Sequence, residues 1–224
     1  MGPTDHQPGA GERRPSILSK PYLAVGLLVS ALVLAGCNRN PLLVKRSPCP
    51  AVAIPTYSGS VTKFDPAQSR DADAIDVTAQ LIDVVGTCSE SAEYLSTDLS
   101  FKVTAQRRKP GPARQVYLPI FVALAQGGNV LVSKQVTGVM VEFPEGQLRA
   151  EARGGARADV HRSAVTLPTE VQDRISRPRR PDEPDALVDP LSDPQVRAAV
   201  RAASFEVLVG FQLDDASLAY NVGK

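Results

Sequence analysis

The stretch VYLPIFVALAQGGNV, residues 116–130, decides the fold class. Every second position from 116 to 124 is aliphatic, and the positions between them include Tyr117 and Phe121. Successive side chains of a strand point to opposite faces, so this pattern predicts a central strand that is covered on both sides. Pro119 is the exception in the pattern, because proline cannot donate a hydrogen bond to a neighbouring strand.

Alternation of apolar and polar residues continues on both sides of this stretch. Gln126-Gly127-Gly128-Asn129 is typical of a hairpin turn and leads into a predicted strand over residues 130–141. Period-two alternation also runs through residues 75–81, 99–105 and 205–213. These segments are predicted to be antiparallel strands, with one face of 75–81 and of 99–105 in water.

The rest of the chain adds weaker strands and a helix. Residues 148–153 and 160–167 are predicted to be two further strands, separated by Gly154-Gly155. Asp193-Pro194 is typical of a helix start and predicts one short helix near residues 194–203. The total of seven or eight strands favours an all-β fold, an antiparallel β-sandwich of the immunoglobulin or fibronectin-III-like kind. A small closed barrel is the alternative.

Residues 1–36 have the organisation of a secretory signal peptide. Arg13, Arg14 and Lys20 precede an uncharged, mostly apolar run over residues 21–36. A helix of this run would be about 24 Å long, which is shorter than the roughly 30 Å hydrocarbon core of a bilayer. The alternatives are an uncleaved amino-terminal membrane helix, as in a single-pass membrane protein, and a buried core helix.

The residues that follow this apolar run, Leu34-Ala35-Gly36-Cys37, resemble the lipobox of bacterial lipoproteins. The resemblance implies cleavage before Cys37, a diacylglyceryl group on its thiol and an acyl chain (palmitate, for example) on its new amino group. Two or three such chains would attach the protein persistently to a membrane. Asn38 stands where an Asp commonly retains lipoproteins in the inner membrane, so the outer membrane is favoured, with the protein facing the periplasm.

The mature chain is predicted to have two parts. Residues 37–50 are proline-rich and basic and form a lipidated tether, and residues 51–224 form the β-sandwich domain. The polar, proline-rich segment 176–194 is predicted to be a flexible insertion in that domain. Residues 207–213, followed by 218–221, resemble the closing strand of uncharacterised predicted lipoproteins of Gram-negative bacteria, a resemblance that implies no activity.

Assigning Cys37 to lipid leaves two of the three cysteines, Cys49 and Cys88, as a pair in an oxidising compartment. A bridge between them would close a loop of about 39 residues and stabilise the fold by roughly 4 kcal/mol in the chain-entropy treatment. The alternative is a pair of buried free thiols, since cysteine packs as a small hydrophobic residue.

The composition of the mature chain argues against nucleic-acid binding and against common catalytic centres. Without residues 1–36, the chain keeps 22 basic and 22 acidic residues, so it lacks the cationic surplus that neutralises phosphates. His161 is its single histidine, and Ser58-Gly59-Ser60 is not a G-x-S-x-G nucleophile motif but a predicted turn. We therefore expect no enzymatic activity and no cofactor.

Three charged clusters are candidate binding sites. Asp71, Asp73 and Asp76 could hold calcium, although their spacing lacks the glycine and glutamate of a calcium loop and favours a solvated turn. The run Arg107-Arg108-Lys109 could contact anionic lipid, although a charged hairpin loop is the plainer interpretation. The arginines within residues 177–180 are balanced by the acids that follow them.

These observations favour a non-enzymatic cell-envelope lipoprotein that binds another envelope protein or supports an assembly. A periplasmic small-ligand carrier or hydrolase is the rival hypothesis, and it requires a roomy apolar pocket with a few convergent polar groups.

Overall fold

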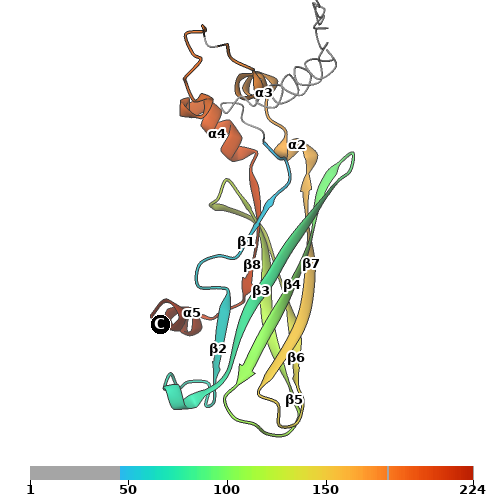
Figure 1. Ribbon diagram of the computed structural model, residues 1–224, viewed down its shortest axis with the longest axis vertical. Helices are drawn as coiled ribbons and strands as arrows, with labels where there is room; N and C mark the ends of the chain where they lie inside the picture. The colour runs from blue at the N-terminus through green and yellow to red at the C-terminus, as the bar shows by residue number, and fades with distance from the viewer. Residues whose placement is uncertain (1–45, 181, 224) are drawn as a thin grey trace, which may run out of the picture. The chain divides into compact units, whose positions relative to one another are not determined.

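The computed structural model describes residues 46–180 and 182–223. Eight strands among these residues form two four-stranded sheets (Figure 1). Sheet A has the order β1-β8-β5-β6 and sheet B the order β2-β3-β4-β7. The strands are β1 (Ala51–Ala53), β2 (Ser60–Phe64), β3 (Ile75–Glu90), β4 (Tyr94–Arg107), β5 (Arg114–Gln126), β6 (Val130–Phe143), β7 (Arg149–His161) and β8 (Phe205–Phe211). The described residues are thus mostly β and confirm the coarser prediction of seven or eight strands in two sheets.

All strand pairs are antiparallel except β1 and β8, which run parallel over three residues. The core lies between the sheets and takes alternate side chains from both. Val77, Leu95 and Val103 contribute from sheet B, and Ile120 and Val207 from sheet A, all at most 1% exposed. Burial of each such side chain contributes roughly 1.5–3 kcal/mol relative to exposure.

The strand that decided the fold class, β5, is central in sheet A, as predicted, with β8 on one side and β6 on the other. Leu118 and Ile120 are fully buried on its core face. Pro119 is tolerated because β8 ends at Phe211, which pairs with Ile120, so the proline lies just past the last paired residue of β8. Its carbonyl accepts a hydrogen bond from the backbone N–H of Gln212 at 2.9 Å.

A single strand, β7, replaces the two strands predicted on either side of Gly154-Gly155. The prediction was wrong because the glycine pair was interpreted as a break, whereas it lies inside β7 and pairs with β4. A Cβ on Gly154 would lie 2.4 Å from the Phe101 ring, and one on Gly155 would lie 2.8 Å from the Leu99 carbonyl oxygen. Glycine is needed here for close approach to β4, not for a turn.

The described part of the chain has more helix than the single segment predicted near 194–203. That segment is α4, and the side chain of Asp193 caps it by accepting a hydrogen bond from Gln195 N at 2.8 Å. This helix, α4, spans Pro194–Ala202. The other helices are α2 (Arg162–Val165), α3 (Thr169–Ser176) and α5 (Asp215–Gly223), and there are two 3₁₀ turns, η1 (Ala72–Ala74) and η2 (Pro190–Ser192). No helix among the described residues is long and apolar enough to cross a membrane.

The helices between β7 and β8 have a small core of their own. Leu167, Ile175, Val196 and Ala203 are buried together, apart from the core between the sheets. The predicted strand at 160–167 therefore ends early, because α2 turns the chain toward this second cluster.

Within the predicted flexible insertion, 176–194, the structure places ion pairs and turns. Arg177 pairs with Glu183 at 3.4 Å and with Asp185 at 2.7 Å, and η2 precedes α4. Its flexibility stays a prediction.

Candidate functional site

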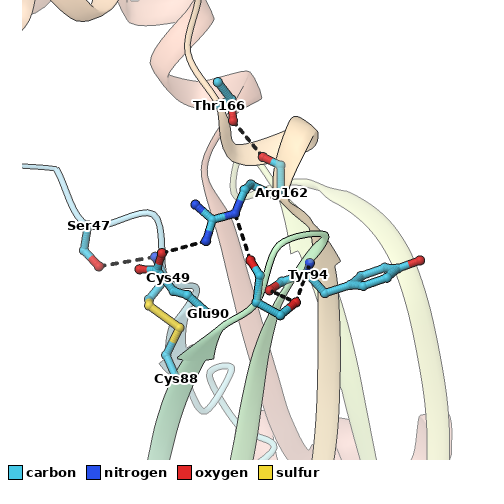
Figure 2. Close-up of polar contacts among 8 residues, drawn as sticks. Ser47, Cys49, Cys88, Glu90, Tyr94, Arg162 and Thr166 are labelled. Atoms are coloured by element: carbon cyan, nitrogen blue, oxygen red, sulfur yellow. Dashed lines mark hydrogen bonds and ion pairs between the residues drawn. A yellow bond between two sulfur atoms is a disulfide. The ribbon is translucent and has the colours of Figure 1, made fainter.

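The predicted cysteine pair forms a disulfide (Figure 2). The Sγ atoms of Cys49 and Cys88 are 2.12 Å apart and their Cα atoms 6.0 Å apart. The bridge joins the chain just before β1 to the end of β3, and thus confirms this part of the site prediction. Cys37, the predicted lipidation residue, lies outside the described residues. We call the region around the bridge, formed by Arg46, Cys49, Cys88, Glu90 and Arg162, the disulfide end.

Arg46 fastens the amino-terminal side of this region. Its guanidinium donates hydrogen bonds to the backbone carbonyl oxygens of Val165, at 2.9 Å, and Ala203. Burial lowers the pKa of the Arg46 side chain, since a charged guanidinium loses water there. The chain thus contacts the last residue of α2 and the residue after α4 before it reaches the disulfide.

Arg162 ties the turn between β3 and β4 to α2 (Figure 2). Its Nε donates to the Ser91 carbonyl at 3.0 Å, and one terminal nitrogen contacts the Glu90 carboxylate at 3.0 Å. Thr166 donates its hydroxyl to the Arg162 carbonyl at 2.8 Å, which closes α2. These contacts fix loops in place, so the disulfide end holds the β3–β4 turn and α2 together.

His161, the single histidine of the predicted mature chain, is the N-cap of α2. Its Nδ1 accepts a hydrogen bond from Ser163 N and lies 2.7 Å from Ser163 Oγ. The ring packs edge-on against Tyr94, with ring centroids 5.3 Å apart. The hydroxyl of Ser58, in the predicted turn, donates a hydrogen bond to the Pro55 carbonyl at 2.8 Å and closes that turn. Both side chains have local structural roles.

Asp71, Asp73 and Asp76, the candidate calcium ligands, do not form a common metal site. Asp73 pairs with Arg108, and Asp76 pairs with Arg114 at 2.6 Å. In residues 46–180 and 182–223, no three His, Cys, Asp or Glu side chains are grouped in a way that could hold a metal ion. The acids neutralise neighbouring arginines, including one from the basic run.

Arg107 was interpreted as part of a charged loop, and this interpretation was wrong. Its side chain is 2% exposed. The guanidinium donates to four backbone carbonyls and lies 5.5 Å from the centre of the Phe143 ring. The acceptors are Gln147 O at 2.6 Å, Pro112 O at 2.8 Å, Gly111 O at 2.9 Å and Pro144 O at 3.1 Å. It joins the β4–β5 loop to the β6–β7 loop and is not available to a lipid surface.

Residue type does not distinguish Arg107 from Arg108 and Lys109, but its position in the strand pattern does. The odd-numbered positions of β4 point into the core, and Arg107 continues the series that Val103 and Ala105 begin. Extending that alternation two residues further is the one signal that could have placed the side chain inside.

A pocket of about 460 Å³ lies against β2 and the start of α5. Lys63, Arg70 and Asp214 line it together with Phe64 and Gln212. A hydrogen bond from Ser217, and the nearby Arg70 charge, hold the pKa of Asp214 below its ordinary value. The Gln212 Oε1 atom is buried and has no hydrogen-bond partner among the described residues. The pocket can therefore offer the cations of Lys63 and Arg70 and the apolar ring of Phe64 to a small molecule.

The outer face of sheet A, turned away from the core, is apolar but incompletely covered. Ala123 is buried there, whereas Tyr117, Val136 and Met140 are 52%, 57% and 47% exposed. The prediction that β5 is covered on both sides therefore holds for only part of its outer face. Comparison with known proteins adds nothing to this picture, because no family model, curated protein or solved structure matches the chain.

Proposed function

We propose that this protein is a lipid-anchored component of a bacterial cell envelope, whose β-sandwich binds or assembles with other proteins at the membrane surface. The observation that carries the proposal is the disulfide between Cys49 and Cys88. Disulfides persist in oxidising compartments such as the periplasm, and this bridge follows closely after the lipobox-like Cys37. Export and acylation account for all three cysteines of the chain.

The contacts of Arg46 suit a domain that follows a short tether. Eight residues, 38–45, separate Cys37 from Arg46, whose guanidinium binds the backbone carbonyls of Val165 and Ala203. A sandwich of the predicted immunoglobulin or fibronectin-III-like kind suits the binding role, since such domains present sheet faces and loops to other proteins.

The test of anchoring is metabolic labelling with a palmitate analogue, followed by intact-mass measurement of the purified protein. We expect a labelled chain that begins at Cys37 and contains one disulfide. Cys37→Ser should abolish the label, whereas the matched substitution Cys88→Ser should remove the disulfide and keep the label. An unlabelled chain that retains residues 1–36 would contradict the anchor and favour a single-pass membrane protein.

The test of a binding role is cross-linking in intact envelopes, followed by isolation from solubilised membrane. We expect a stoichiometric protein partner in the cross-linked product. A product that contains no second polypeptide would count against the binding role and leave the anchor proposal standing on its own test.

A second candidate function, a carrier of a small acidic amphiphile, rests on the pocket at Lys63. Lys63 lines this pocket, and among the described residues no hydrogen bond or ion pair engages its ammonium. A carboxylate could bind the lysine while the apolar part of the same molecule contacts Val61, Phe64 and Leu213, which also line the pocket. Medium-chain amino acids and fatty acids should raise the melting temperature, and Lys63→Glu should abolish the shift while Lys109→Glu should not. No shift with any such compound would exclude this candidate.

A further inference from the structure

The exposed apolar residues of sheet A form a pattern along β6. Residues 134, 136, 138, 140 and 142 share the outer face, because they alternate with the buried Val139, Val141 and Phe143. In chain order they are Lys134, Val136, Gly138, Met140 and Glu142. We call these five residues, together with Tyr117 of β5, the outer β6 face.

Opposite charges lie at the two ends of this face, at equal separations from Gly138. The Lys134 ammonium is 5.0 Å from the centre of the Phe121 ring, and Glu142 accepts a hydrogen bond from the Gln115 side-chain amide at 2.7 Å. No described residue of opposite charge forms an ion pair with either of them. Both charges therefore remain open to a partner.

The centre of the face is flat and aromatic. The Tyr117 hydroxyl donates to the Thr137 carbonyl at 3.2 Å, so its ring lies across Gly138. A Cβ on Gly138 would meet this ring at 2.5 Å, and glycine is therefore required below it. A half-exposed tyrosine between apolar neighbours is typical of the centre of a protein interface.

We propose that the outer β6 face packs against the same face of a second copy of the chain, about a two-fold axis that passes near Gly138. With the two β6 strands antiparallel, Lys134 lies opposite Glu142 of the second copy and Val136 lies opposite Met140. The axis generates each pair twice, as in any isologous interface. Two stacked sheets lie about 10 Å apart, which long Lys and Glu side chains can bridge.

Charge decides between this arrangement and the other ways of occupying the face. A parallel pairing would place Lys134 on Lys134 and Glu142 on Glu142, which is repulsive. An unrelated partner would need its own matching order of acid, apolar residues and base, whereas a second copy already has it. This pairing goes beyond the proposed anchoring and does not depend on acylation of Cys37.

Sedimentation equilibrium of the purified full chain in density-matched detergent tests the proposal. We expect a dimer for the unmodified sequence. Lys134→Glu and Glu142→Lys should each weaken dimerisation about tenfold or more, because each creates two like-charge pairs. The double reversal Lys134→Glu/Glu142→Lys restores both pairs and should return the dissociation constant to within about threefold of the original. Arg153→Glu, an exposed charge reversal on β7, is the matched control and should have no effect.

The proposal is overturned if the unmodified chain is a monomer, or if the double reversal dissociates as readily as the single ones. All substituted residues are exposed, and circular dichroism of each variant verifies that it is folded. Intact mass of the same samples reports acylation, so failure of dimerisation and failure of anchoring are distinguished.

Discussion

Each end of the sandwich is stabilised by a different kind of bond. At the disulfide end, a covalent bond joins Cys49 to Cys88 across 39 residues of sequence. At the opposite end of β4, the Arg107 guanidinium donates hydrogen bonds to four backbone carbonyls of two loops. The disulfide acts mainly by limiting the unfolded chain, whereas Arg107 acts only in the folded state. Only the first of these fastenings depends on the redox conditions of the compartment.

Removing the disulfide should have the largest effect. The double substitution Cys49→Ala/Cys88→Ala should lower the free energy of unfolding by about 4 kcal/mol, because the unfolded chain regains the entropy of a loop of about 39 residues. Urea denaturation measures this loss. Adding reductant to the unmodified protein should reproduce it and leave the variant unchanged. If reductant lowered the free energy of unfolding of both proteins equally, its effect would not come from breaking the disulfide.

Removing the buried arginine should cost slightly less. Arg107→Ala should lower the free energy of unfolding by about 3 kcal/mol, since it leaves buried carbonyls without donors. Arg107→Lys should fall between the alanine variant and the unmodified protein, because an ammonium reaches fewer of the four acceptors. Combining Arg107→Ala with the cysteine double substitution should give additive losses, as the two ends share no contacts. A non-additive loss in urea denaturation would show that the ends are coupled.

Arg162 sharpens the comparison, because it is also an arginine that ties loops together, but it is exposed. Its side chain is 44% exposed at its contact with Glu90. Arg162→Ala should therefore lower the free energy of unfolding by about 1 kcal/mol or less in urea denaturation. A loss as large as that of Arg107→Ala would mean that burial does not explain the difference between the two arginines.

Acid should produce the smallest effect. Hydrogen bonds from Ser96 and Arg157 hold the pKa of Asp159 below its ordinary value of 3.8. A carboxyl group with a lowered pKa stabilises the fold above its ordinary pKa, and this contribution is lost as pH falls through the lowered value. Asp159→Asn should therefore be less stable than the unmodified protein near neutral pH, with the difference shrinking below pH 3.8. Urea denaturation at both pH values measures this, and a difference independent of pH would contradict it.

Alternation along the chain was sufficient to predict most of the strands. It worked for β3, β5 and β8 because each has one face in a core that spans the whole sheet. It failed at Gly154, where the residue choice is set by Phe101 of β4, 53 positions earlier in the sequence. It also missed the short helices α2 and α3, which have few apolar residues. Ile175 of α3 is buried in the small separate cluster, whereas Val165 of α2 is buried in the main core.

The disulfide could be predicted by counting cysteines, whereas the role of Arg107 depends on the fold. Pairing Cys49 with Cys88 required only that Cys37 be set aside. Arg107 could not be recognised in the same way, because its acceptors are backbone carbonyls, which every residue carries. The arrangement of Lys134 and Glu142 became visible only once β6 was known to be an edge strand with one bare face.

The position of Cys49 also matters for how the protein would bear load. A pull on the chain from its amino-terminal side passes through the bridge into β3, a strand of 16 residues that pairs with β4 over most of its length and with β2 over its first residues. The three-residue β1, which would otherwise peel from β8 one bond at a time, carries none of that tension. Reduction of the disulfide would transfer the force to the three-residue pairing of β1 with β8. The disulfide should therefore raise the force needed to unfold the domain as well as its free energy of unfolding.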